Sequence, residues 1–413
     1  MTDAQTEAIT DSEPKRSFSI RLESNRMTTL MRRLPASPKA VMMTVFSITA
    51  LFVLARLVVA GEGNISRFVV AGSTFTDPLD PPPIHIVSNE GYDGQFYWRL
   101  AADPTDLRLE FSNGVRLDQP LRASRILYPT LSWLLAAGHK EWIKWSLIVV
   151  NIVGMGAAAY FASLRAASAG QRAIVGLLAV SASGLVMSVS RDLTEVAMVA
   201  CLMAGAHLLH QGRHVLAGVS WAGALLAHDQ SLYVLIGFAA WLGFSSMRNR
   251  SLNGRPWITA AIPAVAFAAW QAIARTQLGV FPVLDSRNQS VGIPGVDLGS
   301  AILDWVRGGF LDNKVLLPQL VALVSIVWCA WKRRGLIAAN DQWMLFSCGS
   351  ALLGSLSLSK NVWVGPADLR QVVLVAVLSS LIVISSGKPP GRWVTLAVPG
   401  VWILTAGFRV VAI

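Results

Sequence analysis

Charged side chains are scarce in this sequence: Asp, Glu, Lys and Arg make up 14% of its 413 residues, against 53% hydrophobic residues. A soluble domain carries about 25% charged residues, so the shortage excludes an ordinary soluble protein. The chain instead contains many apolar runs of roughly 15 to 22 residues, a length that crosses a bilayer as a helix. These runs are too long and too uniformly apolar for barrel strands. The sequence therefore predicts an all-α polytopic membrane protein.

Cysteine is also rare, with only Cys201, Cys329 and Cys348, all inside apolar runs and none in a CxxC pair. This excludes a disulfide framework and a cysteine metal site. Neither a zinc-protease HExxH motif nor a phosphate-binding GxxxxGK[ST] loop occurs. No cofactor is expected, and a divalent metal is not indicated.

The first 40 residues lack the apolar core of a cleavable signal. We expect residues 1–40 to form a disordered, basic cytoplasmic tail. The net charge of +11 comes from Lys and Arg in short clusters between apolar runs. That pattern is typical of cytoplasmic loops in a membrane protein and not of nucleic-acid binding. We therefore expect no nucleic-acid partner.

The basic clusters also predict the topology. Those at 248–255, 332–334 and 388–392 should all be cytoplasmic. This fits about eleven transmembrane helices in a domain covering 41–413, with the N-terminus inside and the C-terminus outside. The expected spans are 41–60, 143–164, 173–189, 194–209, 214–228, 230–247, 257–275, 315–331, 336–357, 370–386 and 393–411. A multi-pass protein of the plasma or inner membrane follows.

The polar segments then gather on the outer face. Residues 61–142 form an external loop, in which 125–138 is too short for a span and is expected as an interfacial or re-entrant helix. Residues 276–314 form a second external loop with a short helix near 298–307. This second loop is either a mobile lid or a plain surface loop.

The external loop contains "GYDGQFYWRLAADP", which predicts a short interfacial helix from Asp93 to Asp103. Asp93, Phe96 and Tyr97 would share one face of this helix, with Gln95 and Arg99 on the other. Asp93 is either a helix N-cap or a carboxylate able to accept a proton from an attacking hydroxyl.

This stretch, followed by "RILYPTLSWLLAAG" and "RDLTE", resembles the GT-C superfamily of integral-membrane glycosyltransferases over residues 89–200. The resemblance implies a polyprenyl-phosphate-sugar donor and a glycan, lipid or protein acceptor at the membrane lipid surface. It also implies that Asp93 is the general base. Many members have a paired acidic motif here, whereas this chain has Gly94 after Asp93.

A leaving phosphate needs cationic groups, and arginine suits it by its bidentate fork. The candidates are Arg125, Arg191 and Arg370, each of which could instead be an interfacial arginine reaching toward the headgroups. Tyr92, Gln95 and Tyr97 are expected in the substrate pocket.

Three acidic or histidine residues complete the candidate pocket. Glu195 either lines the cavity or closes a capping box with Asp192 at the start of a span. His228 and Asp229 are either pocket residues or a satisfied turn pair. Two other functions stay open: a lipid or small-molecule transporter, and a non-catalytic cell-envelope scaffold.

Overall fold

The computed structural model describes residues 37–250, 254–285, 292–307, 316–363 and 369–411. Within these ranges the chain is nearly all helix, which confirms the predicted class. A single pair of two-residue strands, β1 (Ala71–Gly72) and β2 (Ile86–Val87), runs parallel. The predicted tail lies outside the described residues up to position 36.

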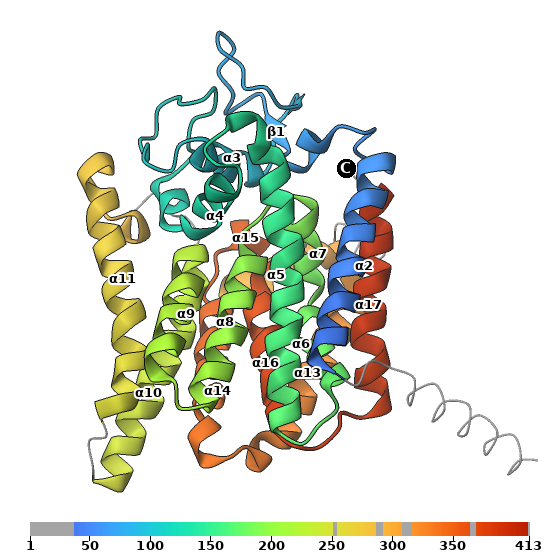
Figure 1. Cartoon of the computed structure of the whole chain (residues 1–413), viewed down its shortest axis with the longest axis vertical. Coiled ribbons are helices and arrows are strands. Elements are labelled where there is room, and N and C mark those ends of the chain that lie inside the picture. Colours follow the sequence, from blue (N-terminus) through green and yellow to red (C-terminus); the bar gives the residue numbers. More distant parts are fainter. Residues whose placement is uncertain (1–36, 251–253, 286–291, 308–315, 364–368, 412–413) are drawn as a thin grey trace, which may run out of the picture.

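The helices form an upright bundle with a cap of loops and short helices at one end (Figure 1). The bundle helices are α2 (Pro38–Val59), α5 (Lys140–Ser168), α6 (Leu177–Val180), α7 (Ser183–Ser190), α8 (Glu195–His210), α9 (His214–Ala227), α10 (Leu232–Asn249), α11 (Gly254–Leu278), α13 (Leu316–Arg333), α14 (Trp343–Leu356), α16 (Val373–Ser385) and α17 (Arg392–Val411). The shorter elements are α3 (Gly94–Ala102), α4 (Leu127–Leu135), α12 (Val296–Arg307), α15 (Lys360–Trp363) and the 3₁₀ turns η1 (Ile65–Phe68), η2 (Pro120–Ser124), η3 (Ala173–Gly176), η4 (Asp229–Ser231), η5 (Pro282–Leu284), η6 (Arg334–Leu336), η7 (Ala339–Asp341) and η8 (Arg370–Val372).

Among the described residues, six helices are long and apolar enough to cross a membrane, or seven if a bent pair is one span. The six are α2, α5, α10 with its preceding turn, α11, α13 with its following turn, and α17. A helix, or the bent pair, is also present at each of the remaining predicted spans. However, α8, α9, α14 and α16 have only 13 to 16 residues, below the 20 or so that span a bilayer. The structure supports a multi-pass membrane protein, and the count of eleven stays a prediction.

The bent pair is the segment predicted as one span over 173–189. Here η3 with α6 and the following α7 meet at 65°. The Ser181 hydroxyl donates to the Leu177 carbonyl at 2.7 Å, and Gly184 follows the break. Serine hydroxyls that bond to the preceding turn, together with a glycine, weaken a helix at this point.

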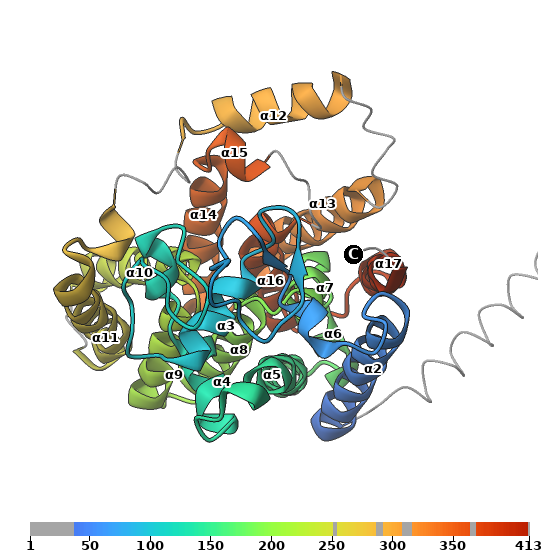
Figure 2. The same cartoon turned by 90° about the horizontal axis from the view of Figure 1, so that it is seen from above.

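The cap, here called the loop end, consists of residues 60–139 above the ends of α5, α8 and α9 (Figures 1 and 2). The predicted helix after Asp93 is present as α3, but every one of its residues is buried. Gln95 and Arg99 are each 1% exposed, so α3 does not have the polar outer face that was predicted. The reason is that the following loop wraps around it, and Arg99 donates to the carbonyls of Arg108 and Val115.

Two other short helices match their predicted positions. Helix α4 falls inside the expected interfacial segment and exposes Trp133, Leu134 and Leu135. Helix α12 runs across the bundle axis at its side (Figure 2) and is joined to α15 by a 2.6 Å ion pair from Lys360 to Asp304. Residues 286–291 and 308–315 of the predicted lid lie outside the described residues, so the lid stays a prediction.

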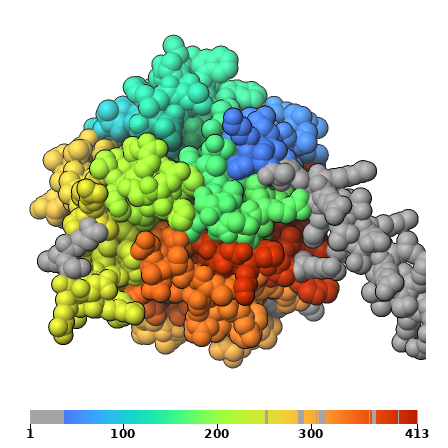
Figure 3. Space-filling view, turned by 60° about the horizontal axis from the view of Figure 1, so that its bottom comes forward, coloured from blue at the N-terminus to red at the C-terminus, as the bar shows by residue number. Residues whose placement is uncertain are grey.

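The opposite end of the bundle holds a polar cluster that the sequence did not reveal. Arg165, near the end of α5, forms a buried ion pair with Asp341, and His210 Nδ1 lies 3.5 Å from the same carboxylate. In Figure 3, which turns this end forward, the green segment after α5 borders the orange and red segments. Buried polar side chains therefore lie at both ends of the bundle. The sequence predicts instead that the polar residues other than the basic clusters gather at one end.

Candidate functional site

Asp93 occupies the N-cap position of α3 but does not act as a cap. Its backbone is helical, and its side chain makes no hydrogen bond to the free N–H groups of the helix. Instead, Asp93 Oδ2 lies 2.8 Å from Arg122 Nη1 and 2.9 Å from Arg370 Nη2. The side-chain capping interpretation is therefore wrong. The carboxylate joins two arginines that are far apart in the sequence.

The glycine after Asp93 is required by close backbone contact. A Cβ on Gly94 would lie 2.5 Å from the Arg191 carbonyl oxygen and 2.7 Å from that of Val69. A side chain at this position would push α3 away from both segments. A residue with a side chain, an acidic one included, therefore does not fit at position 94 without a shift of the backbone.

Arg370 connects the most distant parts of the cluster. It lies in η8, which begins the α16 segment, and its Nε is 2.8 Å from Glu195 Oε1. Its Nη1 donates to the Tyr92 hydroxyl at 3.2 Å, while Nη2 contacts Asp93. Three donors of one guanidinium thus bind three residues from two different segments, which fixes its plane.

Glu195 is the first residue of α8 and does not close a capping box. The N-cap residue is Thr194, whose side chain makes no capping bond. Glu195 turns its carboxylate to Arg370 and accepts a hydrogen bond from Ser188 Oγ at 2.9 Å. Asp192, the other proposed box residue, is fully buried in a left-handed conformation with φ of 50°. The capping interpretation of this segment is therefore wrong.

Arg191, another predicted phosphate ligand, lies beside the ring of Tyr92, as Arg370 does. Its guanidinium carbon is 4.5 Å from the centroid of the Tyr92 ring, and that of Arg370 is 5.5 Å from it. Tyr92 thus lies within cation–π distance of both arginines. The structure thus brings together Asp93, Arg370, Arg191 and Tyr92, whereas their roles in a substrate site stay a prediction.

Arg125 forms a second part of the cluster. Its Nε lies 2.6 Å from Asp229 Oδ1, and its Nη1 donates to the Tyr97 hydroxyl at 3.0 Å. His228 Nδ1 lies 3.5 Å from Asp229 and accepts a hydrogen bond from the Gln230 backbone N–H. Its Nε2 is 3.8 Å from the carboxylate of Glu195. The pair at 228–229 is thus both a turn and a bridge between the two parts of the cluster.

Gln95 is the predicted pocket residue that the structure uses elsewhere. Its Nε2 donates to the Glu90 carbonyl at 2.8 Å, and its Oε1 accepts from the Gly72 N–H at 2.9 Å. Both ends of the amide therefore stabilise the loop backbone that holds Asp93 in place.

Arg122 is the site residue that sequence reasoning missed. It forms a two-bonded ion pair with Asp118 at 2.9 and 2.8 Å, and it lies over the Phe96 ring at 4.9 Å. The spacing of four between Asp118 and Arg122 was the available signal. Nothing in that pattern alone indicates that the arginine also reaches Asp93.

The cluster is electrostatically balanced although it is mostly buried. Burial would raise the pKa of Asp93, but Arg122, Arg370 and Arg125 outweigh it and hold this pKa well below its usual range. Burial lowers the pKa of His228 to about 4, with Arg125 adding to the effect. At neutral pH, Asp93 is therefore an ionised carboxylate, and His228 is a neutral imidazole.

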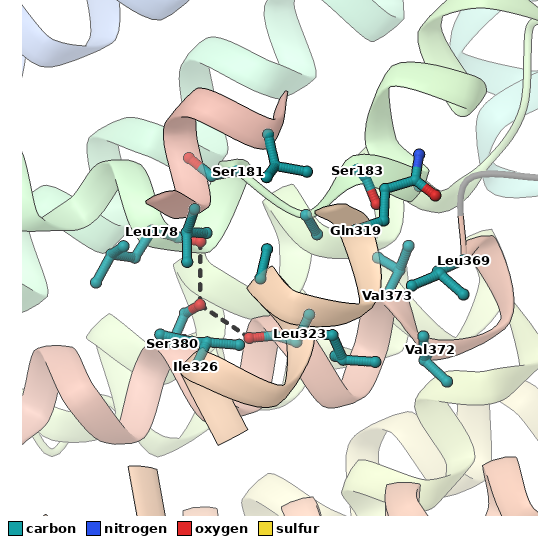
Figure 4. Close-up of a pocket in the computed structure, with 16 residues that line it drawn as sticks. Leu178, Ser181, Ser183, Gln319, Leu323, Ile326, Leu369, Val372, Val373 and Ser380 are labelled. Atoms are coloured by element: carbon teal, nitrogen blue, oxygen red, sulfur yellow. Dashed lines mark hydrogen bonds between the residues drawn. The ribbon is translucent and has the colours of Figure 1, made fainter. Parts of the chain in front are cut away.

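An apolar crevice begins beside Arg370 and runs into the bundle between α6, α7, α13, α16 and α17. It is narrow, with a cavity volume of about 30 Å³. Figure 4 shows Leu369 and Val372 at one side of this crevice and Leu178 and Ser380 at the other. The charged cluster thus adjoins a narrow apolar space.

Gly184, which lines the crevice, sets the position of the backbone at Arg370. A Cβ on Gly184 would lie 2.8 Å from Arg370 Cα and 2.4 Å from Val373 Cγ2. Only glycine allows η8 to lie so close to α7. The break in the bent pair thus lines the crevice with Ser181, Ala182 and Ser183, and Gly184 beside it allows the close approach of η8.

A metal site does not emerge from the described part of the chain, where no three His, Cys, Asp or Glu side chains are grouped as ligands. Comparisons of the chain with protein-family models, with curated proteins and with solved structures gave no match. The geometry around Asp93 and Arg370 is therefore the basis on which a function can be assigned.

Proposed function

We propose that the protein transfers a sugar from a polyprenyl-phosphate donor to a hydroxyl acceptor on the outer face of the membrane. The acceptor is a cell-envelope glycan, a lipid or a protein. The observation that carries the proposal is the convergence of Asp93 with Arg122 and Arg370, next to an apolar crevice that Leu369 and Val372 line on either side of Arg370 in the sequence. An anionic headgroup with a long apolar chain matches this combination of charge and apolar surface.

The proposed reaction divides the work between the carboxylate and the arginines. The acceptor hydroxyl oxygen attacks the anomeric carbon, and its proton passes to Asp93 as general base. The bond from that carbon to the phosphate oxygen breaks, and polyprenyl phosphate leaves with the electron pair. Direct displacement of this kind inverts the anomeric centre. Arg122 and Arg370 stabilise the charge that develops on the leaving phosphate.

We propose that this division of roles is the one that the resemblance to GT-C glycosyltransferases implies. Asp93 matches the acidic residue of the first external loop in that superfamily. Arg125, Arg191 and Arg370 are the proposed donor-phosphate ligands, to which the geometry adds Arg122. Arg370 contacts Asp93 directly, whereas Arg125 pairs with Asp229. We therefore place Arg370 at the centre of the phosphate site and assign Arg125 to its edge.

The proposal includes eleven membrane crossings with the loop end outside. The shorter helices α8 and α9 pack on each other and on the long helices α5 and α11, which supports their crossing as part of the same bundle. The test is labelling of introduced cysteines with a membrane-impermeant maleimide. Thr74→Cys, exposed at the loop end, should react in intact cells. Arg213→Cys, exposed between α8 and α9, should react only after permeabilisation, and the reverse pattern would overturn this orientation.

The decisive experiment is sugar transfer in proteoliposomes from a panel of radiolabelled polyprenyl-phosphate sugars. Wild type should transfer one of them, and Asp93→Asn should lose transfer by at least about a hundredfold, as for removal of a general base. Asp80→Asn, an exposed site in the same loop, is the matched control and should keep full activity. Equal transfer by Asp93→Asn would remove Asp93 from the chemistry. Movement of lipid across the vesicle without acceptor would favour a transporter.

A further inference from the structure

We propose that Asp93 occupies, in the substrate-free protein, the place of a donor phosphate oxygen between Arg122 and Arg370, and that the phosphate displaces it. The inference rests on the proposed function and adds an order of events to it. The donor must bind before Asp93 can serve as a base.

The first argument is that a single oxygen is shared. Asp93 Oδ2 contacts Nη1 of Arg122 at 2.8 Å and Nη2 of Arg370 at 2.9 Å. One anionic oxygen between two guanidinium groups is also the arrangement in which arginines hold a phosphate oxygen. The carboxylate and a phosphate therefore compete for the same donors.

The second argument is that the arginines do not depend on Asp93 for their positions. Arg122 is held by two bonds to Asp118. Arg370 is held by Glu195 and by the Tyr92 hydroxyl. Each arginine thus has a carboxylate of its own, and both stay in place when Asp93 leaves.

The third argument concerns the freedom of the carboxylate. Asp93 makes no capping bond within α3, so its side chain can rotate without loss of a helix contact. The side chains of Asp93 and Arg370 are 16% and 19% exposed, whereas that of Glu195 is 2% exposed. A substrate can therefore reach the contact between Asp93 and Arg370 while the anchor behind it stays buried.

The exchange has a chemical consequence. While it is paired with the arginines, Asp93 has a pKa well below its usual range and is a weak base. Once the phosphate takes over these arginines, the carboxylate is released with a greater affinity for a proton. Activation of the acceptor is thereby tied to the presence of the donor.

The test measures binding of a C20 polyprenyl phosphate without sugar to the purified full-length protein in detergent. Asp93→Asn should bind this lipid about tenfold more tightly than wild type, equivalent to about 1.4 kcal/mol, because the competing carboxylate is gone. Asp118→Asn should bind it more weakly, since Arg122 loses its own anchor. Equal or weaker binding by Asp93→Asn would overturn the exchange.

Two further arms identify the ligand chemistry. C20 polyprenol, which lacks the phosphate, should bind wild type and Asp93→Asn equally. Inorganic phosphate should show the same preference for Asp93→Asn at a much higher concentration, because it gains nothing from the crevice. A preference for Asp93→Asn that appears with polyprenol would contradict phosphate exchange.

The two proposals fail in different ways. Tighter binding by Asp93→Asn, without sugar transfer by wild type from any donor, would keep the exchange and reject the glycosyltransferase. Transfer by wild type, with unchanged lipid affinity in Asp93→Asn, would keep the enzyme and reject the exchange. Thermal unfolding of each variant verifies that it is folded.

Discussion

Arg370 and Glu195 meet side by side, with Nε of the arginine 2.8 Å from Oε1 of the glutamate. The Glu195 side chain is 2% exposed, so this pair is among the most enclosed ionic contacts of the cluster. It joins the start of α8 to the turn that begins the α16 segment. The orientation of Arg370 toward Asp93 and the crevice depends on it.

A double-mutant cycle should reveal this dependence. Breaking a buried ion pair leaves the other charge without its partner, so Glu195→Gln and Arg370→Gln should each destabilise the protein by about 3 kcal/mol or more. The double variant should lose much less than their sum, with a coupling of about 1 to 3 kcal/mol. Unfolding free energies in detergent provide the measurement.

The pair Glu62–Arg67, also at 2.8 Å but with a Glu62 side chain that is 68% exposed, is the matched control for this cycle. Its coupling should stay below about 1 kcal/mol, because solvent screens it. Equal coupling in the two pairs would contradict a special role for the buried pair.

Gly94 should tolerate no side chain. Gly94→Ala places a Cβ within 2.5 Å of the Arg191 carbonyl oxygen, which should cost about 1 to 3 kcal/mol of unfolding free energy and should reduce sugar transfer by moving Asp93. Gly243→Ala is the control, since nothing lies within 4 Å of its added Cβ in α10. It should be neutral or slightly stabilising. A neutral Gly94→Ala would contradict the steric exclusion of a side chain at position 94.

Much of the site was predictable because its residues are unusual for their surroundings. Glu195 and Arg370 are charged residues at the ends of apolar runs, where charge is costly unless it is used, and Asp93 is a carboxylate beside three aromatic residues in the external loop. The structure places all three in one network. The helix positions were predictable from the apolar runs, because a long apolar run in a membrane protein forms a helix.

The parts that sequence reasoning missed depend on long-range contacts. Arg122 reads as one half of a local pair with Asp118, and only the fold brings it to Asp93. Arg165 is likewise buried against Asp341, a residue from a distant segment that nothing in the sequence around Arg165 indicates. Local patterns do not encode which distant segments meet, so these partners could not be derived from them.

Filling the crevice should select against long lipids. Ala322 lines the crevice on α13 and is 8% exposed. Ala322→Phe should weaken binding of a C20 polyprenyl phosphate by about tenfold and spare a C5 analogue that does not enter the crevice. Val324→Phe, at a position 64% exposed on the same helix, should bind both lipids as wild type does. Equal loss for both chain lengths would place the lipid chain elsewhere.

Asp192 should destabilise the protein increasingly as pH rises. It is fully buried, and in the described part of the chain neither of its carboxylate oxygens has a hydrogen-bond partner. Burial raises its pKa well above the usual range, although Arg56 opposes the shift. Because the folded state holds this proton more tightly than the unfolded state, the stability that protonation provides is present at pH 4. It is lost as pH rises toward the folded pKa.

Asp192→Asn should therefore raise the free energy of unfolding by about 1 kcal/mol or more at pH 8 and change it little at pH 4. Asparagine also tolerates the left-handed backbone at this position, where φ is 50°, so the substitution tests the charge without adding strain. Asp80→Asn, at an exposed loop position, should show no such difference between the two pH values. A loss of stability in Asp192→Asn at pH 8 would mean that attraction to Arg56 outweighs the cost of burying the carboxylate.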